Sequence, residues 1–360
     1  MKFRYCFLLL ALLVMISCKK TLDVKDAPDF TVTTDANTYK VNDLIRFKIE
    51  GSADIISFYS GEVYRDYAFK DGRVVDVSGQ KDSLSFNSGV APGTPAGTQL
   101  NQFSILASTD FSGNYNDLTS VKVATWKDIT SRFTLGTTAT LVKSPTQNIT
   151  DLVVAGKPIY FSLKYISKPQ VANGYARQWL TENFTITSSV RLNDVPVVIT
   201  DQVHAGFRIV DQNPVNAPAR SQVTTTRVTL YGPFYKDPKD PIFDPANPIF
   251  DPKNPIYDPA STQYIATAVL PKFVPYDPNS PYNDPLSENW AVSAPISLDK
   301  VDLGTDKAVA VRSSVYTVKP TLYTYRYAKP GTYKAVFVAT NSTIDESKKI
   351  IKEIGFTITP

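Results

Sequence analysis

The chain has 360 residues, with 38 lysines and arginines against 34 aspartates and glutamates, which gives a formal net charge of +4. This near-balance, without a Lys/Arg cluster in the body of the chain, argues against nucleic acid as a partner. One histidine and two cysteines exclude a disulfide framework and a cysteine metal site. The 19 phenylalanines, 20 tyrosines and 26 prolines favour β-sandwiches over helices.

Residues 1–17 have the pattern of a secretory signal peptide. A basic start precedes an apolar run at 7–16, which is too short for a membrane span of roughly 20 residues. The run ends in a serine followed by Cys18, and this pattern is typical of a bacterial lipobox. We expect cleavage before Cys18, which removes Cys6, and acylation of Cys18, which anchors the chain to a membrane. Residues 18–28 would then form a polar, lipidated tether.

Short runs of alternating apolar and polar residues follow the tether. Examples are "FTVTTD" at 30–35, "LIRFKIEG" at 44–51 and "EIGFTIT" at 353–359. Such runs recur every 10–20 residues or so, with turn residues between them, and helical periodicity is nearly absent. The pattern predicts an all-β fold of stacked antiparallel sheets. About 340 mature residues exceed one typical domain, so we expect two cores.

A heptad repeat interrupts this pattern at 236–260. Its prolines exclude a helix or a central strand, because proline lacks an N–H and fixes φ. Each Asp-Pro-x-Asn segment predicts a type I turn, and the following Asn-Pro-Ile-aromatic segment is expected to be extended. Two interpretations stay open: an arm whose Phe243, Phe250 and Tyr257 touch a partner, or a repeat expansion tolerated in a surface loop, which we favour.

Two distant segments look like the halves of one sandwich. The first begins "FTVTTDANTYKVNDLIRFKIEG", and the second contains "YAKPGTYKAVFVATN". The second half carries the pattern Y-x-x-x-G-x-Y at Tyr327, Gly331 and Tyr333, followed by Val336. Joined, the halves resemble a polycystic-kidney-disease (PKD) repeat, an Ig-like β-sandwich. The resemblance implies a split domain of residues 29–80 and 318–360, with residues 81–317 inserted in one of its loops.

The inserted part has a resemblance of its own. "FSILASTDFSGNY", "VATWKDITSRF", "KPIYFSLKY" and "RQWLTENFTI" look like strands of jelly-roll domains of the discoidin and cleaved-adhesin kind. With "FYSGE" and "ENWAVSAPI", they resemble an uncharacterised family of Bacteroidetes lipoproteins encoded beside starch-utilisation-type importers. The resemblance implies a lipid-anchored outer-membrane protein, at the cell surface, that binds polysaccharide for an importer. Lys19 and Lys20 stand where surface-exported relatives carry acidic residues, so the periplasmic face stays an alternative.

Two sets of residues are candidates for binding. One loop offers oxygen ligands of the kind that Ca²⁺ takes, although capping of turns is the favoured alternative: Asp110, Asn114, Asn116 and Asp117. Sugar binding needs flat aromatic rings that stack on a pyranose. The loop candidates are Tyr115, Tyr175, Tyr235, Tyr276 and Tyr282. The strand candidates, for which core packing is the favoured alternative, are Trp126, Trp179 and Trp290.

No catalytic motif is present. His204 is the sole histidine, and the chain has neither a phosphate-binding loop nor a G-x-S-x-G elbow. Glycoside hydrolysis needs two carboxylates roughly 5–9 Å apart, and no acidic pair stands in a recognisable setting. We therefore expect a non-catalytic protein without a cofactor other than the calcium ion. The first alternative is a structural or adhesive, fimbrial-type surface protein, and the second is a glycoside hydrolase.

Overall fold

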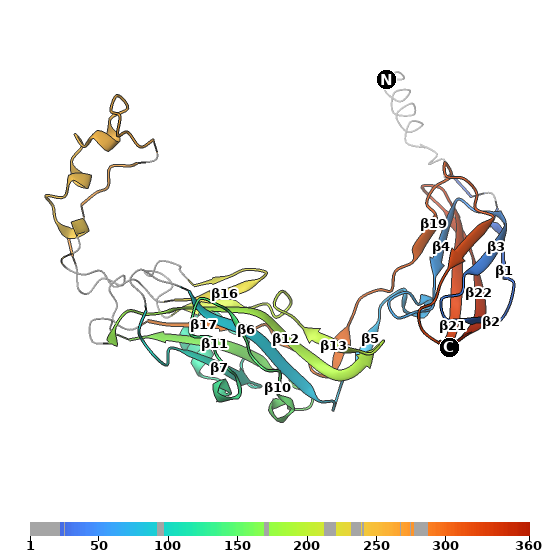
Figure 1. Ribbon diagram of the computed structural model, residues 1–360, viewed down its shortest axis with the longest axis horizontal. Coiled ribbons are helices and arrows are strands. Elements are labelled where there is room, and N and C mark those ends of the chain that lie inside the picture. The colour runs from blue at the N-terminus through green and yellow to red at the C-terminus, as the bar shows by residue number, and fades with distance from the viewer. Residues whose placement is uncertain are drawn as a thin grey trace, which may run out of the picture. The chain divides into compact units, whose positions relative to one another are not determined.

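The computed structural model describes the following residues: 22–24, 26–91, 97–168, 173–211, 221–231, 239, 241–266, 268–273, 275–276 and 287–360. The expected signal peptide, Cys18, Tyr235 and Tyr282 lie outside them. Two compact units are present (Figure 1). One contains the described residues up to Val75 together with Asp302–Pro360, and the other is Asp76–Val301. Within the described residues, no helix has the length and apolar character that a membrane span requires.

The first unit is a sandwich of two sheets. The smaller sheet has the order β1 (Asp29–Thr34), β3 (Ile45–Ser52) and β20 (Leu322–Tyr325). The larger has the order β19 (Val309–Arg312), β4 (Ile55–Tyr59), β21 (Gly331–Ser342), β22 (Ser347–Thr359) and β2 (Thr38–Lys40). Neighbouring strands are antiparallel, except that β2 runs parallel to β22. The expected all-β architecture is confirmed.

Aromatic side chains fill the core of the first unit. Strand β3 alternates as its sequence predicts, so that Ile45, Phe47 and Ile49 are buried while the residues between them are exposed. The ring of Phe47 lies 5.5 Å from that of Phe58 and 5.2 Å from that of Phe337, centroid to centroid. Tilted and edge-on contacts of this kind add to the free energy gained from burial. Halves far apart in sequence therefore share one core.

Strand β19 belongs to the first unit. The sequence interpretation assigned residues 81–317 to the insert, whereas β19 pairs with β4 from Val309 opposite Phe58 onward. The difference arises because a short edge strand carries too little pattern to show which sheet it joins. Strands β5 (Val74–Asp76) and β18 (Lys300–Asp302) form a two-stranded sheet where the chain passes from one unit to the other.

The second unit is a larger sandwich. Its seven-stranded sheet has the order β10 (Gln147–Asn148), β6 (Asp82–Ala91), β12 (Gln178–Leu192), β16 (Arg227–Leu230) and β15 (Gln222–Val223), with β13 (Val195–Thr200) beside β12 and β9 (Val142–Lys143) beside β6. Its five-stranded sheet has the order β14 (Arg208–Asp211), β17 (Ser287–Val292), β11 (Tyr160–Ser167), β7 (Phe103–Ser108) and β8 (Lys127–Asp128). The main core lies between these sheets.

The five-stranded sheet is covered on both faces. Phe161, Leu163 and Tyr165 of β11 point into the main core, and Tyr160 belongs to a second apolar cluster on the opposite face. Helix α2 (Leu118–Lys122) contributes to that second cluster with its two buried residues, Leu118 and Val121. Burial on both faces explains why nearly every residue of β7 and β11 is buried, whichever face its side chain points to.

The heptad repeats fold into regular turns. Asn247 N–H donates to Asp244 O at 3.0 Å, and the amide two residues after Asp244 donates to its Oδ1 at 2.9 Å, which confirms the predicted Asp-Pro turn. The expected extended segment is wrong: η5 (Pro248–Phe250) is a 3₁₀ turn. Only Asn247 itself is extended, because its Oδ1 caps the turn by accepting the amide of Ile249. Turns η4 (Pro241–Phe243) and η6 (Pro255–Tyr257) repeat the element.

Each repeat is bonded to the one before it. The Asn247 Nδ2 donates to Pro241 O at 2.7 Å, and Asn254 Nδ2 donates to Pro248 O at 2.8 Å. Two rings that follow the repeats pack edge-on against repeat rings, with Phe273 on Phe250 at 5.3 Å and Tyr276 on Phe243 at 5.2 Å. The repeats and the described residues that follow them therefore form a folded ribbon, which we call the arm (the described residues of 241–276).

Candidate functional site

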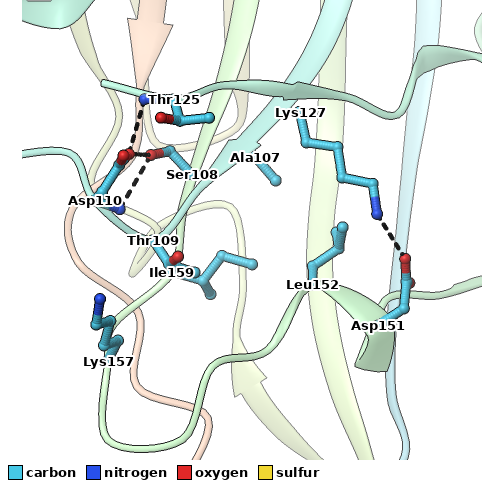
Figure 2. A pocket seen from close by; sticks show the side chains of 10 residues that line it. All are labelled: Ala107, Ser108, Thr109, Asp110, Thr125, Lys127, Asp151, Leu152, Lys157 and Ile159. Carbon is cyan, nitrogen blue, oxygen red and sulfur yellow. Dashed lines mark hydrogen bonds and ion pairs between the residues drawn. The ribbon is translucent and has the colours of Figure 1, made fainter. Parts of the chain in front are cut away.

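A pocket of about 380 Å³ opens beside the end of β7 in the second unit (Figure 2). Four parts of the chain supply its walls. They are β7 with the loop after it, β8 with Thr125 just before it, η3 (Thr150–Leu152), and the segment that precedes β11. The lining residues are Ala107, Ser108, Thr109, Asp110, Thr125, Lys127, Asp151, Leu152, Lys157 and Ile159. Antiparallel pairing of β7 with β8 and β11 brings these four parts of the chain together.

Asp110 is fixed at one wall by three hydrogen bonds. Its Oδ1 accepts from Ser108 Oγ at 2.7 Å and from Thr125 N at 2.8 Å, and its own backbone N–H donates to Ser108 Oγ at 3.2 Å. The bonds from Ser108, and then those from Thr125, hold the pKa of the Asp110 carboxyl below its usual value. Figure 2 shows these groups gathered at one corner of the pocket. Asp110 is therefore an ionised acceptor at neutral pH.

Asp151 stands at a second wall and is also ionised. Arg132 donates to both of its carboxylate oxygens at 2.7 Å, and Lys127 Nζ lies 3.0 Å from Oδ2. The bidentate bond from Arg132, followed by that from Lys127, holds the pKa of Asp151 well below its usual range. The 3₁₀ turn η3 places this carboxylate, since Asp151 lies within it.

Lys157 provides the remaining charged group. It follows a tight turn in which its amide donates to Val154 O at 3.0 Å and Gly156 has a φ of +72°, a conformation that favours glycine. The amine forms no ion pair with any side chain in the described parts of the chain, and Figure 2 shows it apart from both carboxylates. Two lysines thus balance two aspartates in the lining.

The base of the pocket is apolar. Ala107, Leu152 and Ile159 are buried and belong to the main core. An apolar base with separate hydroxyl, carboxylate and ammonium groups around it suits a ligand that has both C–H surface and many hydroxyls. The balanced charge of the lining favours a neutral ligand over a strongly charged one.

The predicted calcium loop uses its oxygens in turns. Asp117 caps α2 by accepting from Ser120 N at 2.8 Å, and Asn114 Oδ1 accepts from Asn116 N at 3.1 Å. Asp110 lies instead in the pocket, bonded as described above. Across the described residues, no group of three or more His, Cys, Asp or Glu side chains has an arrangement suited to a metal ion. Calcium binding by this loop stays a prediction.

Three predicted aromatic residues share the second apolar cluster. Trp290 is buried, and Trp126 packs edge-on against it at 5.4 Å. Trp126 Nε1 donates to Val121 O at 2.8 Å, and Tyr115 Oη donates to Ser293 O at 2.7 Å. The rings pack against apolar neighbours, and the polar atoms of Trp126 and Tyr115 are used in hydrogen bonds to the backbone. The core alternative weighed for the tryptophans describes their contacts better than an open sugar platform does.

The other predicted aromatic residues are scattered. Trp179 lies in the main core and stacks on Phe103 at 5.0 Å. Tyr175 lies on a loop and is 43% exposed. Its backbone carbonyl accepts hydrogen bonds from the amides of Thr98 and Gln99. Tyr276 packs against Phe243 within the arm, so its ring is partly covered. None of the predicted aromatic residues within the described parts lines the pocket.

The sequence interpretation missed most of the pocket. Of its lining residues, only Asp110 was a candidate, and Lys157 and Asp151 drew no attention because each stands alone in its stretch of sequence. One signal was available: the short turn "VAGK" directly before the apolar run "PIYFSLKY" marks a fixed polar residue at a strand entrance.

Fold and site together define a two-unit β-sandwich protein with a polar surface pocket. Residues 17–207 match the model of a family described as a domain of unknown function (DUF5017), which is more than half of the chain. The chain therefore belongs to that family. Comparison with curated proteins and with solved structures gives no significant match.

Proposed function

We propose that this protein is a non-catalytic envelope lipoprotein, anchored through Cys18, that binds polysaccharide or oligosaccharide for an outer-membrane importer. The observation that carries the carbohydrate proposal is the pocket beside β7, with its apolar base and its separate hydrogen-bonding walls. The anchor rests on the lipobox that ends in Cys18.

The dimensions of the pocket support a short stretch of glycan as the ligand. Pockets for small ligands measure roughly 300–1,000 Å³, and this one lies near the lower limit with about 380 Å³. Ala107, Leu152 and Ile159 contribute the small exposed parts of buried side chains to the lining, which gives the C–H groups of a sugar a limited apolar contact. Thr109 and Lys157 lie at the walls. The Thr109 hydroxyl can donate to a sugar hydroxyl or accept from one, and the Lys157 ammonium can donate to one.

The charge state of the walls supports binding without bond cleavage. A glycoside hydrolase needs one carboxylic acid with a raised pKa, so that it can protonate the leaving oxygen. Asp110 and Asp151 both have lowered pKa values, because hydrogen bonds and cationic neighbours stabilise their ionised forms. Each is an acceptor for sugar hydroxyls and neither is suited to general acid catalysis.

Affinity electrophoresis against a panel of polysaccharides tests the proposal. We expect retardation by at least one glycan and no release of reducing ends. Lys157→Ala should weaken retardation about tenfold, since a hydrogen bond to a charged group contributes roughly 1.5–3 kcal/mol. The matched control is Lys143→Ala, an exposed lysine on β9 outside the pocket. Absence of retardation by every glycan, or equal retardation of the Lys157 variant, contradicts the proposal, and release of reducing ends supports a hydrolase.

A further inference from the structure

The first described residues of the chain are bound to the turn between β21 and β22. Leu22 N donates to Asp345 Oδ2 at 2.9 Å, and Val24 N donates to Glu346 Oε2 at 2.6 Å. Lys348 Nζ in turn donates to Val24 O at 2.5 Å. The expected tether is therefore fixed to this end of the first unit from Leu22 onward, because three backbone groups are held by one hairpin.

The same end carries the most exposed apolar side chains. Among the described residues, the three most exposed large hydrophobic side chains are Tyr316 at 96%, Val318 at 90% and Ile344 at 87%. Tyr316 and Val318 lie in the loop between β19 and β20, and Ile344 lies at the tip of the β21–β22 hairpin. Leu22 is also more than half exposed. Several large apolar side chains exposed at one end of a unit mark an interaction surface, whereas single exposed apolar residues need no explanation.

The turn between β3 and β4 ties the two loops to one end of the unit. The guanidinium of Arg312 donates to Ala53 O, to Val315 O at 3.0 Å and to Thr317 O. Asp54, which follows Ala53 in the same turn, donates its backbone amide to Asn341 Oδ1 near the end of β21 at 3.0 Å. In Figure 1, β21 and β22 meet at the end of this unit opposite the C-terminus. We call Leu22, Tyr316, Val318 and Ile344 the apolar end.

The apolar end lies within a short reach of Cys18. Four residue steps separate Cys18 from Leu22, and a fully extended chain spans at most about 14 Å over that number. An acyl chain on Cys18 would therefore place a bilayer surface close to Ile344 and Tyr316. Among the acidic groups nearby, Asp345 and Glu346 accept backbone amides, and Glu346 also pairs with Lys348. Asp23, Asp26 and Asp54 line a shallow pocket at the same end, so we expect the contact to be made by the apolar loop residues and not by this pocket.

We propose that the apolar end rests on the lipid surface, with Tyr316, Val318 and Ile344 inserted among the headgroups. This inference depends on the proposed acylation of Cys18. Tyrosine suits the position, because its ring is apolar and its hydroxyl stays hydrated at a membrane interface. The first unit would then stand on the membrane by the end to which its tether is bound, and its opposite end would point away from the bilayer.

Site-specific fluorescence on the acylated full-length protein tests this contact. Signal cleavage removes Cys6 and acylation blocks Cys18, so Ile344→Cys introduces the single thiol for an environment-sensitive dye. The protein is reconstituted in phosphatidylethanolamine–phosphatidylglycerol vesicles that contain nitroxide-headgroup lipid. The control is Asn37→Cys: Asn37 O accepts the amide of Thr357, which lies at the far end of β22. That position is roughly 35 Å away along the strands.

We expect at least twofold stronger nitroxide quenching at position 344 than at position 37. Tyr316→Ser combined with Val318→Ser should reduce the quenching at 344, because the end loses its apolar contacts. Protein that floats with the vesicles but is quenched equally at both positions overturns the inference and leaves the anchor intact. Protein that does not float overturns the anchor and this inference with it. Quenching that depends on protein density identifies a second copy as the occupant instead, which also overturns it.

Discussion

Arg73 and Asp306 form a buried bidentate ion pair although 233 residues separate them in sequence. Arg73 Nε lies 2.9 Å from Oδ1 of Asp306, and Nη2 lies 2.6 Å from Oδ2. The guanidinium also stacks on the ring of Phe69 at 3.6 Å. Arg73 lies just before the chain leaves the first unit, and Asp306 lies just after the chain returns to it. The pair therefore holds these two segments of the first unit together.

Removing one partner of this pair should destabilise the first unit strongly. Arg73→Met leaves the Asp306 carboxylate buried without a cation, which costs about 3–5 kcal/mol. Chemical denaturation followed by circular dichroism measures the loss in the free energy of unfolding. The double variant Arg73→Met with Asp306→Leu should recover most of it, because no charge is then buried. A single variant as stable as the unchanged protein contradicts this assignment.

Asp82 should make stability depend on pH. Burial raises the pKa of this carboxyl to about 6, and its Oδ1 has no hydrogen-bond partner among the described residues. Because the folded-state pKa lies above the unfolded value of 3.8, the protonated form stabilises the fold, and this contribution is lost as pH rises through 6.

Asp82→Asn should therefore stabilise the protein at pH 8 by about 2–3 kcal/mol, since the shift is roughly two pKa units. At pH 4 the difference should almost disappear, because the carboxyl of the folded protein is then protonated. Urea denaturation of both proteins at the two pH values gives the comparison. Asp76→Asn serves as the control, since Asp76 is exposed and its pKa is lowered by hydrogen bonds from Ser78. An equal effect of Asp82→Asn at pH 4 and pH 8 would falsify the assignment.

The arm should loosen when its bridging asparagines are removed. Asn247 caps one turn through Oδ1 and bonds to the preceding repeat through Nδ2, so Asn247→Ala loses both contacts. A cap of this kind contributes about 1 kcal/mol, which predicts amide exchange at Ile249 about fivefold faster. Lys253→Ala, in the same ribbon, is the control, because only the backbone of Lys253 makes a hydrogen bond there. Unchanged exchange at Ile249 would show that the ribbon does not depend on this bridge.

Local pattern in the sequence predicted the strands and the Asp-Pro turns. The alternation in β3 and the pattern around Tyr327 are local properties, and Tyr327 is indeed buried, with its hydroxyl donating to Ser60 O at 2.7 Å. The 3₁₀ turns were missed because the residue before proline is extended while the proline itself can begin a turn. Here the Asn cap decides the outcome.

The pocket could not be predicted because its parts meet only through strand pairing. Asp110, Thr125, Asp151 and Lys157 come from four separate stretches, and nothing local shows that β7 pairs with both β8 and β11. The predicted aromatic residues do not form one site, and here the reason is local. Alternating strands place a ring such as Trp179 inside as readily as outside, so residue type alone does not reveal a binding face.

Hydrogen–deuterium exchange with and without a retarded glycan tests the carbohydrate proposal most directly, because it reports where the ligand lies. The account predicts that saturating glycan slows exchange in residues 107–110, 125–127 and 150–159, and that Lys157→Ala abolishes this protection. Protection confined to the loop of Tyr175 or to the arm, with none around the pocket, would contradict it.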